Sequence, residues 1–315
     1  MTDFTEFHDE LRSVAGDLLA KDRNLEWPTL IDAGWVGLEV PEQFGGAGAS
    51  FAEVAVICEE IGRAAGATHF LGSAVLAAAA LNAVRPSDTR DNLLTELASG
   101  ATRMTVALEP YDFVPDAEGA DRVLIVTDRG IAVTEQQATP RPVVDETRSL
   151  AAVSRDTAGA ELLPFADDTA VQRLHERAAA AIACDSLGLS EAMLTATVGY
   201  VKVRQQFGRA IGSFQAVKHA CADMLVSISV SRQLVGAAVQ AVAEDAPEAG
   251  VAVSMAKSYA CAAAVDIAGK AMQLHGGIGY TWECGIHVYL KRATLNRSLF
   301  GSPSAHRQEL AKRYQ

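Results

Sequence analysis

The chain has 315 residues, of which 49% are hydrophobic and 21% charged, and its formal net charge is −12. This size and apolar content allow a large core, in one large or two to three small domains. The negative net charge argues against nucleic acid as a partner, because that needs a basic face, whereas one arginine is enough to bind a small anion. Scarce aromatic residues (6%) and abundant alanine favour closely packed helices.

The cysteines and the N-terminal sequence predict a cytoplasmic protein. The five cysteines are odd in number, widely spaced and form no C-x-x-C pair, so neither a disulfide framework nor a zinc site is expected. Residues Met1 to Glu6 lack the basic and apolar regions of a signal peptide. No apolar run is expected to reach membrane-spanning length; Leu71–Val84 is too short and is interrupted by Asn82. Most cysteines are expected to be buried in a reducing compartment; they are Cys58, Cys184, Cys221, Cys261 and Cys284.

Residues 1–100 are predicted to form a helical domain. Apolar residues recur every three or four positions in its first segment, and Pro28 suits the first turn of a second helix. Ser50 and Glu53 have the spacing of a capping box. The helices expected here cover Phe4–Leu18, a segment opened by Pro28, Phe51 to about Arg63 and Asp88–Ser99, with a glycine-rich break at Gly34–Gly48.

Residues 101–165 are predicted to form a small β-domain, interpreted as a partial barrel. Short β-branched runs begin near Met104 and include Val123–Thr127 and Ile131–Thr134. The connection Asp128–Gly130 is short and contains glycine, which is typical of a hairpin.

Residues 166–315 return to the helical period almost to the end of the chain. Long alanine-rich helices are expected around 170–200, 215–243 and 248–275, and short turns between long helices indicate an antiparallel bundle. The predicted fold class is therefore mainly α, with a small central β-domain.

The turn Arg204–Gln215 joins two of these helices and combines a cation, two phenylalanines and an amide. An exposed arginine there could bind a phosphate, and Phe207 and Phe214 suggest that something covers the turn. The alternative is an ordinary helix–helix loop. A second unusual segment, Gln273–Glu283, contains Gly276-Gly277, whose simplest interpretation is a helix stop followed by a turn.

Three motifs together resemble the acyl-CoA dehydrogenase family. Gly34–Gly48 with Glu59–Arg63 is similar to its N-terminal domain. Arg204–Gln215, followed by Ala222-Asp223-Met224, is similar to its R-x-x-F-G-x-x-I-x-x-F-Q and A-D-M segments, and Gln273–Glu283 to its Q-x-x-G-G-x-G-Y-x-x-E segment. The resemblance implies a helical N-domain, a central β-domain and a C-terminal four-helix bundle. It also implies FAD and removal of two hydrogens across the α,β bond of an acyl-CoA thioester.

The chain departs from this family at the catalytic base. The family's E-G-T reads Phe300-Gly301-Ser302 here, and phenylalanine cannot accept a proton. Its R-D-A reads Lys291-Arg292-Ala293. Some relatives carry the base on an earlier helix, but the matching segment Arg177–Ile182 is nearly all alanine. Glu176 lies two residues out of register, which rotates it by roughly 200° on a helix, so it is interpreted as a solvent-facing carboxylate or, alternatively, a relocated base.

The β-domain is also reduced. Only Ala107–Asp112 retains a trace of the family's T-E-P-x-x-G-S-D segment, and its W-I-T-N strand has no counterpart. In the family these segments hold the flavin ring, while the neighbouring subunit holds the nucleotide end of FAD. The resemblance therefore assigns to this chain only the second role; the residues expected to contact FAD are Arg204, Phe207, Gln215, Gln273, Gly276 and Gly277.

These features resemble the short subunits of α2β2 steroid-CoA dehydrogenases of actinobacteria. The resemblance implies a longer partner subunit with the catalytic glutamate, an acyl-CoA substrate and an electron-transfer flavoprotein. One alternative is a self-sufficient enzyme with Glu176 or Glu283 as base, and another is a non-catalytic scaffold subunit.

The sequence also gives expectations for four further places. His219 is expected to be a satisfied bundle residue, and His275 a hydrogen-bond partner of the cofactor or of a carbonyl. Trp282 is expected to pack under the glycine loop, and Arg307–Arg313 to form a solvated basic helix end.

Overall fold

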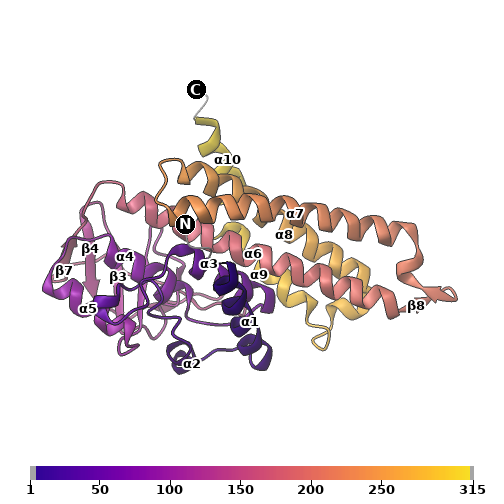
Figure 1. Cartoon of the computed structure of the whole chain (residues 1–315), viewed down its shortest axis with the longest axis horizontal. Coiled ribbons are helices and arrows are strands. Elements are labelled where there is room, and N and C mark those ends of the chain that lie inside the picture. Colours follow the sequence, from indigo (N-terminus) through magenta and orange to yellow (C-terminus); the bar gives the residue numbers. More distant parts are fainter. Residues whose placement is uncertain (1–4, 313–315) are drawn as a thin grey trace.

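The computed structural model describes residues 5–312. Long helices lie side by side and make up most of the molecule, a small β-domain covers one end of them, and the N-terminal helices pack along one side (Figure 1). Phe4 and Arg313, which belong to two predicted helices, lie outside the described residues.

The N-terminal part is helical, as expected. Ser50 caps α3: its Oγ accepts a hydrogen bond from the amide of Ala52 at 3.1 Å, and its own amide donates to Glu53 at 2.8 Å, so the predicted capping box is confirmed. The apolar run after it, not predicted to be helical, forms a π-helix that continues as an α-helix. The elements are α1 (Thr5–Lys21), α2 (Trp27–Asp32), η1 (Glu42–Phe44), α3 (Phe51–Ala64), η2 (Leu71–Ala77), α4 (Ala78–Asn82) and α5 (Asp88–Ala98).

The central strands form two separate small sheets rather than a partial barrel. One sheet has the order β1-β3-β4-β7, with β1 parallel to β3 and the other pairs antiparallel; the second has the order β2-β6-β5. The predicted hairpin is confirmed as β3–β4. Pro115 and Pro140 lie in two-residue strands, and proline cannot extend a ladder, which keeps the second sheet short. The strands are β1 (Met104–Ala107), β2 (Val114–Pro115), β3 (Arg122–Val126), β4 (Gly130–Thr134), β5 (Thr139–Pro140), β6 (Leu150–Ala152) and β7 (Glu161–Pro164).

The C-terminal part is a bundle built on three long helices, within a few residues of the predicted ranges. Small residues let the helices approach closely: a Cβ at Gly188 would collide with the carbonyl of Glu59, and one at Gly62 with that of Asp185. Helices α3 and α6 therefore touch backbone to backbone. The elements are α6 (Ala170–Val203), β8 (Gln205–Gln206), β9 (Arg209–Ala210), η3 (Ile211–Ser213), α7 (Gln215–Ala243), α8 (Ala249–His275), η4 (Gly276–Tyr280), α9 (Ile286–Ser298) and α10 (Pro303–Lys312).

The expectation that no apolar stretch reaches membrane-spanning length was wrong. By length and composition alone, Gln215–Ala243 and Ala249–Tyr280 are long and apolar enough, each with a mean hydropathy of 1.3. Core helices of soluble proteins pass the same test. Most of the apolar stretch in Ala249–Tyr280 is buried in the bundle, whereas only 22% of that in α7 is buried. Contacts among residues 5–312 therefore do not explain the apolar character of α7.

Candidate functional site

The turn between α6 and α7 lies at the end of the bundle that is far from the β-domain (Figure 1). Helix α6 ends at Val203 with Arg204 as its C-cap, and a two-strand turn follows before α7 begins at Gln215. The amide of Ile211 donates to the carbonyl of Arg204 at 2.8 Å and closes the turn. Phe207 and Gly208 both have a positive φ, of 53° and 74°. The turn thus projects Phe207 outward.

The glycine loop after α8 is open to approach by another molecule. Gly276 has a φ of 63° and ends α8, which confirms the predicted helix stop. A Cβ added at Gly276 or Gly277 would meet no atom within 4 Å. Backbone groups at both positions can therefore be reached without displacing a side chain of this chain.

A stacked pair of side chains joins the two segments. The rings of Tyr200 on α6 and His275 on α8 lie 4.5 Å apart with an interplanar angle of 20°. The Tyr200 hydroxyl donates to the carbonyl of His275 at 3.3 Å, and His275 Nδ1 donates to the carbonyl of Ala271 at 2.7 Å. His275 thus bonds a carbonyl, one of its two predicted roles. The pair brings the α6–α7 turn and the glycine loop to the same end of the bundle.

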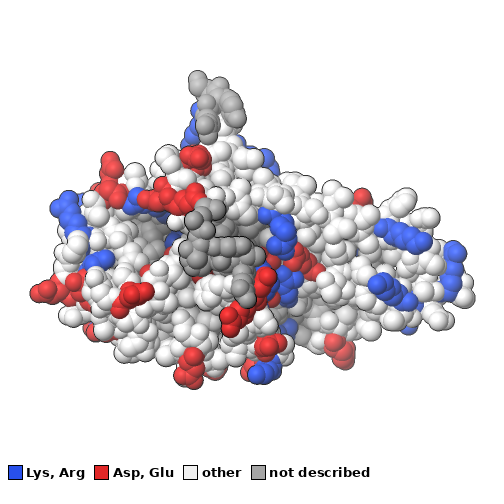
Figure 2. All heavy atoms as spheres, in the orientation of Figure 1, with Lys and Arg blue, Asp and Glu red and all other residues white. Residues whose placement is uncertain are grey.

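All six residues expected to contact FAD are exposed. Phe207 is 91% exposed, so nothing in the described part of the chain covers it. Within residues 5–312, the Arg204 guanidinium makes no ion pair or hydrogen bond, which leaves it free for an anion. Basic side chains gather at this end of the bundle (Figure 2); they include Lys202, Arg204, Arg209 and Lys218, all exposed. Gln273 lies slightly apart, in a groove on the outer face of α8 with Asp266 and Lys270.

One aromatic prediction near this end was wrong. Trp282 is 70% exposed and stands edge-on to His287, with the ammonium of Lys291 at 5.2 Å from its ring, so it does not pack under the glycine loop. His219 lies on the bundle helix α7, where its side chain is exposed. Each of these side chains can be reached from outside the chain. Arg307 on α10 is exposed, as expected for a solvated basic helix end.

Phe300 occupies a tightly held turn between α9 and α10. Its φ is 55°, and Gly301 follows with a φ of 99°. The buried ammonium of Lys257 donates to the carbonyl of Gly301 at 2.8 Å, and His306 Nε2 donates to the carbonyl of Phe300 at 3.0 Å. Phe300 lines a cavity of about 460 Å³ against the β-domain segment 108–115. The position of the family's base thus presents an aromatic ring to a mostly apolar space.

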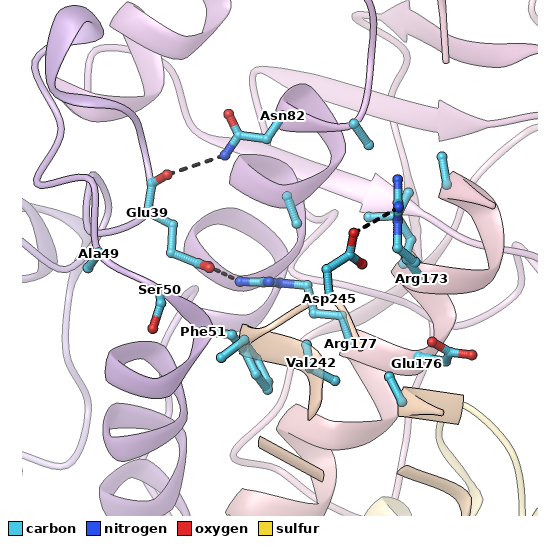
Figure 3. A pocket seen from close by; sticks show the side chains of 16 residues that line it. Glu39, Ala49, Ser50, Phe51, Asn82, Arg173, Glu176, Arg177, Val242 and Asp245 are labelled. Atoms are coloured by element: carbon cyan, nitrogen blue, oxygen red, sulfur yellow. Dashed lines mark hydrogen bonds and ion pairs between the residues drawn. The ribbon is translucent and has the colours of Figure 1, made fainter. Parts of the chain in front are cut away.

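Glu176 lines a different pocket, of about 400 Å³ (Figure 3). Its carboxylate accepts a hydrogen bond from Gln172 at 2.7 Å. The neighbouring Arg177 is buried, forms an ion pair with Glu39 and lies over the Phe51 ring at 4.6 Å; burial lowers the pKa of Arg177 to about 9. Glu176 and Phe300 therefore do not share a cavity. Glu283 is exposed in the loop after η4, and it does not line the Phe300 cavity either.

The residue that does face Phe300 from α6 was missed from the sequence. His175 lines the same cavity, together with Glu109 at its rim. Adjacent residues on a helix point about 100° apart, so His175 and Glu176 open onto different sides of α6. No local sequence signal distinguishes His175 from Glu176 in this respect, because the rotation of α6 against the cavity is set by packing.

Comparison with known proteins agrees with this arrangement. Models of the acyl-CoA dehydrogenase N-terminal and C-terminal domains match residues 5–101 and 168–315. The chain is 36% identical over 291 residues to the acyl-CoA dehydrogenase IpdE2 of Mycobacterium tuberculosis, covering 90% of this chain and 86% of the relative. A variant of the Tcur3481-Tcur3483 steroid ACAD matches its structure with a TM-score of 0.87 at 25% identity, over 98% of this chain and 97% of that one.

The ChsE4-ChsE5 complex from Mycobacterium tuberculosis has the same fold, with a TM-score of 0.84 at 24% identity over 99% of both chains. The fold therefore agrees across the whole described chain, and sequence identity above 30% extends over most of it. This chain belongs to the acyl-CoA dehydrogenase family.

Proposed function

We propose that this chain is one subunit of a hetero-oligomeric, FAD-dependent acyl-CoA dehydrogenase, in which it holds the nucleotide end of an FAD whose ring lies in a partner subunit. The observation that carries the proposal is the contrast between two ends of the molecule, the one beside the β-domain and the one at the α6–α7 turn. The position of the family's base holds Phe300 in an apolar cavity, while the exposed residues that we propose to contact the nucleotide lie at the other end, on the α6–α7 turn and around the glycine loop.

The exposed end of the bundle fits the diphosphate part of FAD. Arg204 is exposed and unpaired among the described residues, and a guanidinium binds phosphate oxygens through charge-assisted hydrogen bonds. The open backbone at Gly276 and Gly277 allows close approach of a dinucleotide. Phe207 offers an apolar wall, and Gln215 and Gln273 offer amides. Bound FAD would supply the hydride acceptor, and this chain would only position its nucleotide end.

An exposed apolar surface on α7 supports a partner subunit. Leu225, Val226 and Val230 on α7 are 55%, 63% and 39% exposed, and Met255 and Tyr259 on α8 are exposed as well. Much of α7 is uncharged in Figure 2. Contiguous exposed apolar patches mark interaction surfaces, because burial of apolar area is worth about 25 cal/mol per Å². A longer acyl-CoA dehydrogenase subunit that carries the catalytic glutamate is the partner we propose for this surface.

The names of similar proteins support a steroid-derived substrate. The Tcur3481-Tcur3483 protein is named as a steroid ACAD, and ChsE4-ChsE5 is named as a complex. By analogy, the acyl group is proposed to be steroid-derived and the assembly α2β2. We further propose that the complex acts in the cytoplasm and passes its electrons to an electron-transfer flavoprotein.

The two alternative functions, a self-sufficient enzyme and a non-catalytic scaffold subunit, predict different results in a co-expression experiment. A self-sufficient enzyme with Glu176 or Glu283 as its base would need that carboxylate near Phe300, but Glu176 lines another pocket and Glu283 is exposed elsewhere. Glu109 does lie at the rim of the Phe300 cavity, where it pairs with Arg155 at 3.1 Å. A scaffold subunit would stabilise its partner without touching FAD.

The test of the proposed function is co-expression with the longer subunit, followed by measurement of FAD per complex and of turnover. Arg204→Ala is expected to lower both while the complex still assembles.

Arg129→Ala is the matched control, since Arg129 is 79% exposed at the β3–β4 hairpin, at the end of the molecule away from the residues proposed to contact FAD. Full FAD content in the Arg204→Ala complex would support the scaffold alternative. An active, yellow preparation of this chain alone would overturn the proposal.

A further inference from the structure

A cleft lies between the N-terminal helical part and the β-domain. Two connecting segments of the N-terminal part, 24–26 and 67–69, form one wall, and the β-domain segment 140–150 with Glu118 forms the other. The volume of this cleft, about 580 Å³, lies within the range of small-molecule sites, about 300–1,000 Å³. None of its lining residues lines the Phe300 cavity or belongs to the proposed FAD contacts, so this interdomain cleft is a separate space.

Three buried polar atoms on the walls of the interdomain cleft have no hydrogen-bond partner within residues 5–312. They are His69 Nδ1, Asp145 Oδ2 and Arg148 Nε. Buried polar groups in folded proteins are nearly always hydrogen-bonded, so an atom without a partner needs an explanation. The Asp145 side chain is fully buried, and that of Arg148 is only 10% exposed. An unpaired acceptor and an unpaired donor therefore lie side by side at the floor of the cleft.

The Asp145 and Arg148 side chains are held in place by their other atoms. Asp145 Oδ1 accepts hydrogen bonds from the amide of Thr147 at 2.9 Å and from its Oγ1 at 2.6 Å. Arg148 Nη2 lies 2.9 Å from the Asp185 carboxylate and donates to Asn296 at 3.2 Å. Asp145 Oδ2 and Arg148 Nε are 3.8 Å apart, which is too far for a hydrogen bond between them. An oxygen about 2.8 Å from each atom would bond to both.

The group that fits between these two atoms is a neutral hydroxyl. A hydroxyl oxygen donates to the Asp145 carboxylate and accepts from Arg148 Nε at the same time. A carboxylate has no hydrogen to donate, and an ammonium group has no lone pair with which to accept. An anion is disfavoured further because the Arg148 charge is already paired with Asp185 and because acidic residues outnumber basic ones on the walls. The charged lining residues are Glu26, Glu118, Asp145 and Glu146 against Arg141 and Arg148.

We propose that the interdomain cleft binds a small neutral polyol of the sugar class, with one hydroxyl placed between Asp145 Oδ2 and Arg148 Nε. The cleft is large enough for a whole sugar ring, and its walls offer both kinds of surface that such a ring needs. Ser149 Oγ and the exposed Glu118 carboxylate, 3.4 Å apart, can bond further hydroxyls. The apolar lining that can contact the CH groups of the ring consists of Leu25, Pro140, Pro142, Val143 and Leu150.

The test compares one sugar with and without a negative charge. Binding of D-glucose and of glucose 6-phosphate to the full-length chain is measured by NMR titration. We expect glucose to bind one site and glucose 6-phosphate to bind it at least about threefold more weakly, because the walls carry an excess of acidic groups. Asp145→Asn keeps an oxygen for the Thr147 bonds but turns the unpaired acceptor into a donor. Glucose binding is expected to weaken about tenfold in this variant, as for one lost hydrogen bond to a charged group.

Two substitutions at exposed prolines locate the site without disturbing the core. Pro142→Trp adds a large side chain on the wall of the cleft and is expected to abolish glucose binding. Pro86→Trp is the matched control, because Pro86 is exposed and does not line the cleft, and it is expected to leave binding unchanged. Circular dichroism checks that each variant folds.

Three results would overturn the proposal. Failure of glucose to bind would mean that an ordered water only fills the gap between Asp145 and Arg148. Normal glucose binding by Pro142→Trp would place the sugar elsewhere, and equal or tighter binding of glucose 6-phosphate would contradict selection of a neutral ligand. The proposal does not rest on the proposed function, since FAD content of the complex is measured separately and shares no residue with this test.

Discussion

Arg292 on α9 and Asp185 on α6 form a fully buried ion pair that connects the two helices. Arg292 Nη2 lies 2.6 Å from Asp185 Oδ2, and its Nε donates to Oδ1 at 3.0 Å. Arg148, from the β-domain, lies 2.9 Å from the same carboxylate, and Asn296 donates to it at 2.6 Å. The family has an aspartate in R-D-A where this chain has Arg292. The inverted charge at this position is therefore matched by an acidic partner inside the same core.

Removal of Arg292 is expected to destabilise the chain strongly. The Arg292→Met variant would leave Asp185 buried with only Arg148 as counter-charge, and breaking a buried pair costs about 3–5 kcal/mol. The measurement is the free energy of unfolding from urea titration. Lys291→Met is the control, because Lys291 pairs with the exposed Glu146 at 2.9 Å and such pairs contribute up to about 1 kcal/mol. Equal loss in both variants would contradict a structural role for the buried pair.

The buried Asp185–Arg292 pair also predicts how the free energy of unfolding changes as the pH falls. Burial alone would raise the pKa of Asp185, but Arg292 and Arg148 outweigh it and hold the pKa below its usual value. A carboxyl group with a lower pKa in the folded state adds stability above its unfolded pKa of about 3.9, and this stability is lost as the pH falls through the folded value. The stability difference between wild type and Asp185→Asn is expected to be full at pH 7 and to shrink below about pH 3.9.

The control for this prediction is Asp128→Asn. Asp128 is 90% exposed at the hairpin and is expected to show no such difference at either pH. A wild-type advantage over Asp185→Asn that grew on acidification would show that Asp185 is not held ionised by its two arginines.

Local sequence patterns predicted much of the helical fold. The three long helices, the Ser50 capping box and the β3–β4 hairpin all depend on residues close together in the chain, and the structure confirms them. The segment Leu71–Asn82 was missed as a helix because it is apolar on nearly every side, and a fully buried helix shows no polar face from which to detect its period.

Tertiary features of the site could not be predicted in this way. Asp185 and Arg292 are 107 residues apart, and nothing in either local pattern indicates that they meet. The sequence singled out Glu176, yet His175 is the α6 side chain that lines the Phe300 cavity. Which of two adjacent helical residues faces a cavity depends on how α6 is rotated against α9 and the β-domain, and packing decides that rotation.

Gly188 is expected to be essential for the contact between α3 and α6. A methyl group there would collide with the carbonyl of Glu59, and overpacking of this kind costs about 1–3 kcal/mol or more when the clash is with backbone. Gly188→Ala should therefore lower the midpoint of thermal unfolding. Gly236→Ala is the matched control: it lies within α7 with open space around it, and alanine in place of an exposed helical glycine is expected to stabilise by up to about 1 kcal/mol. Stabilisation by both substitutions would mean that α3 and α6 can separate at little cost.

The exposed face of α7 is expected to be needed for assembly but not for folding. Val226 is 63% exposed, so Val226→Asp should change the stability of the isolated chain little. In the complex, the new carboxylate would be buried in an apolar contact without a partner, which is strongly unfavourable. Co-purification with the longer subunit is therefore expected to fall sharply for Val226→Asp and to stay normal for Arg129→Asp, which places the same charge at the exposed hairpin. Normal assembly of the Val226→Asp variant would mean that the partner binds another face, and the apolar surface of α7 would then need a different explanation.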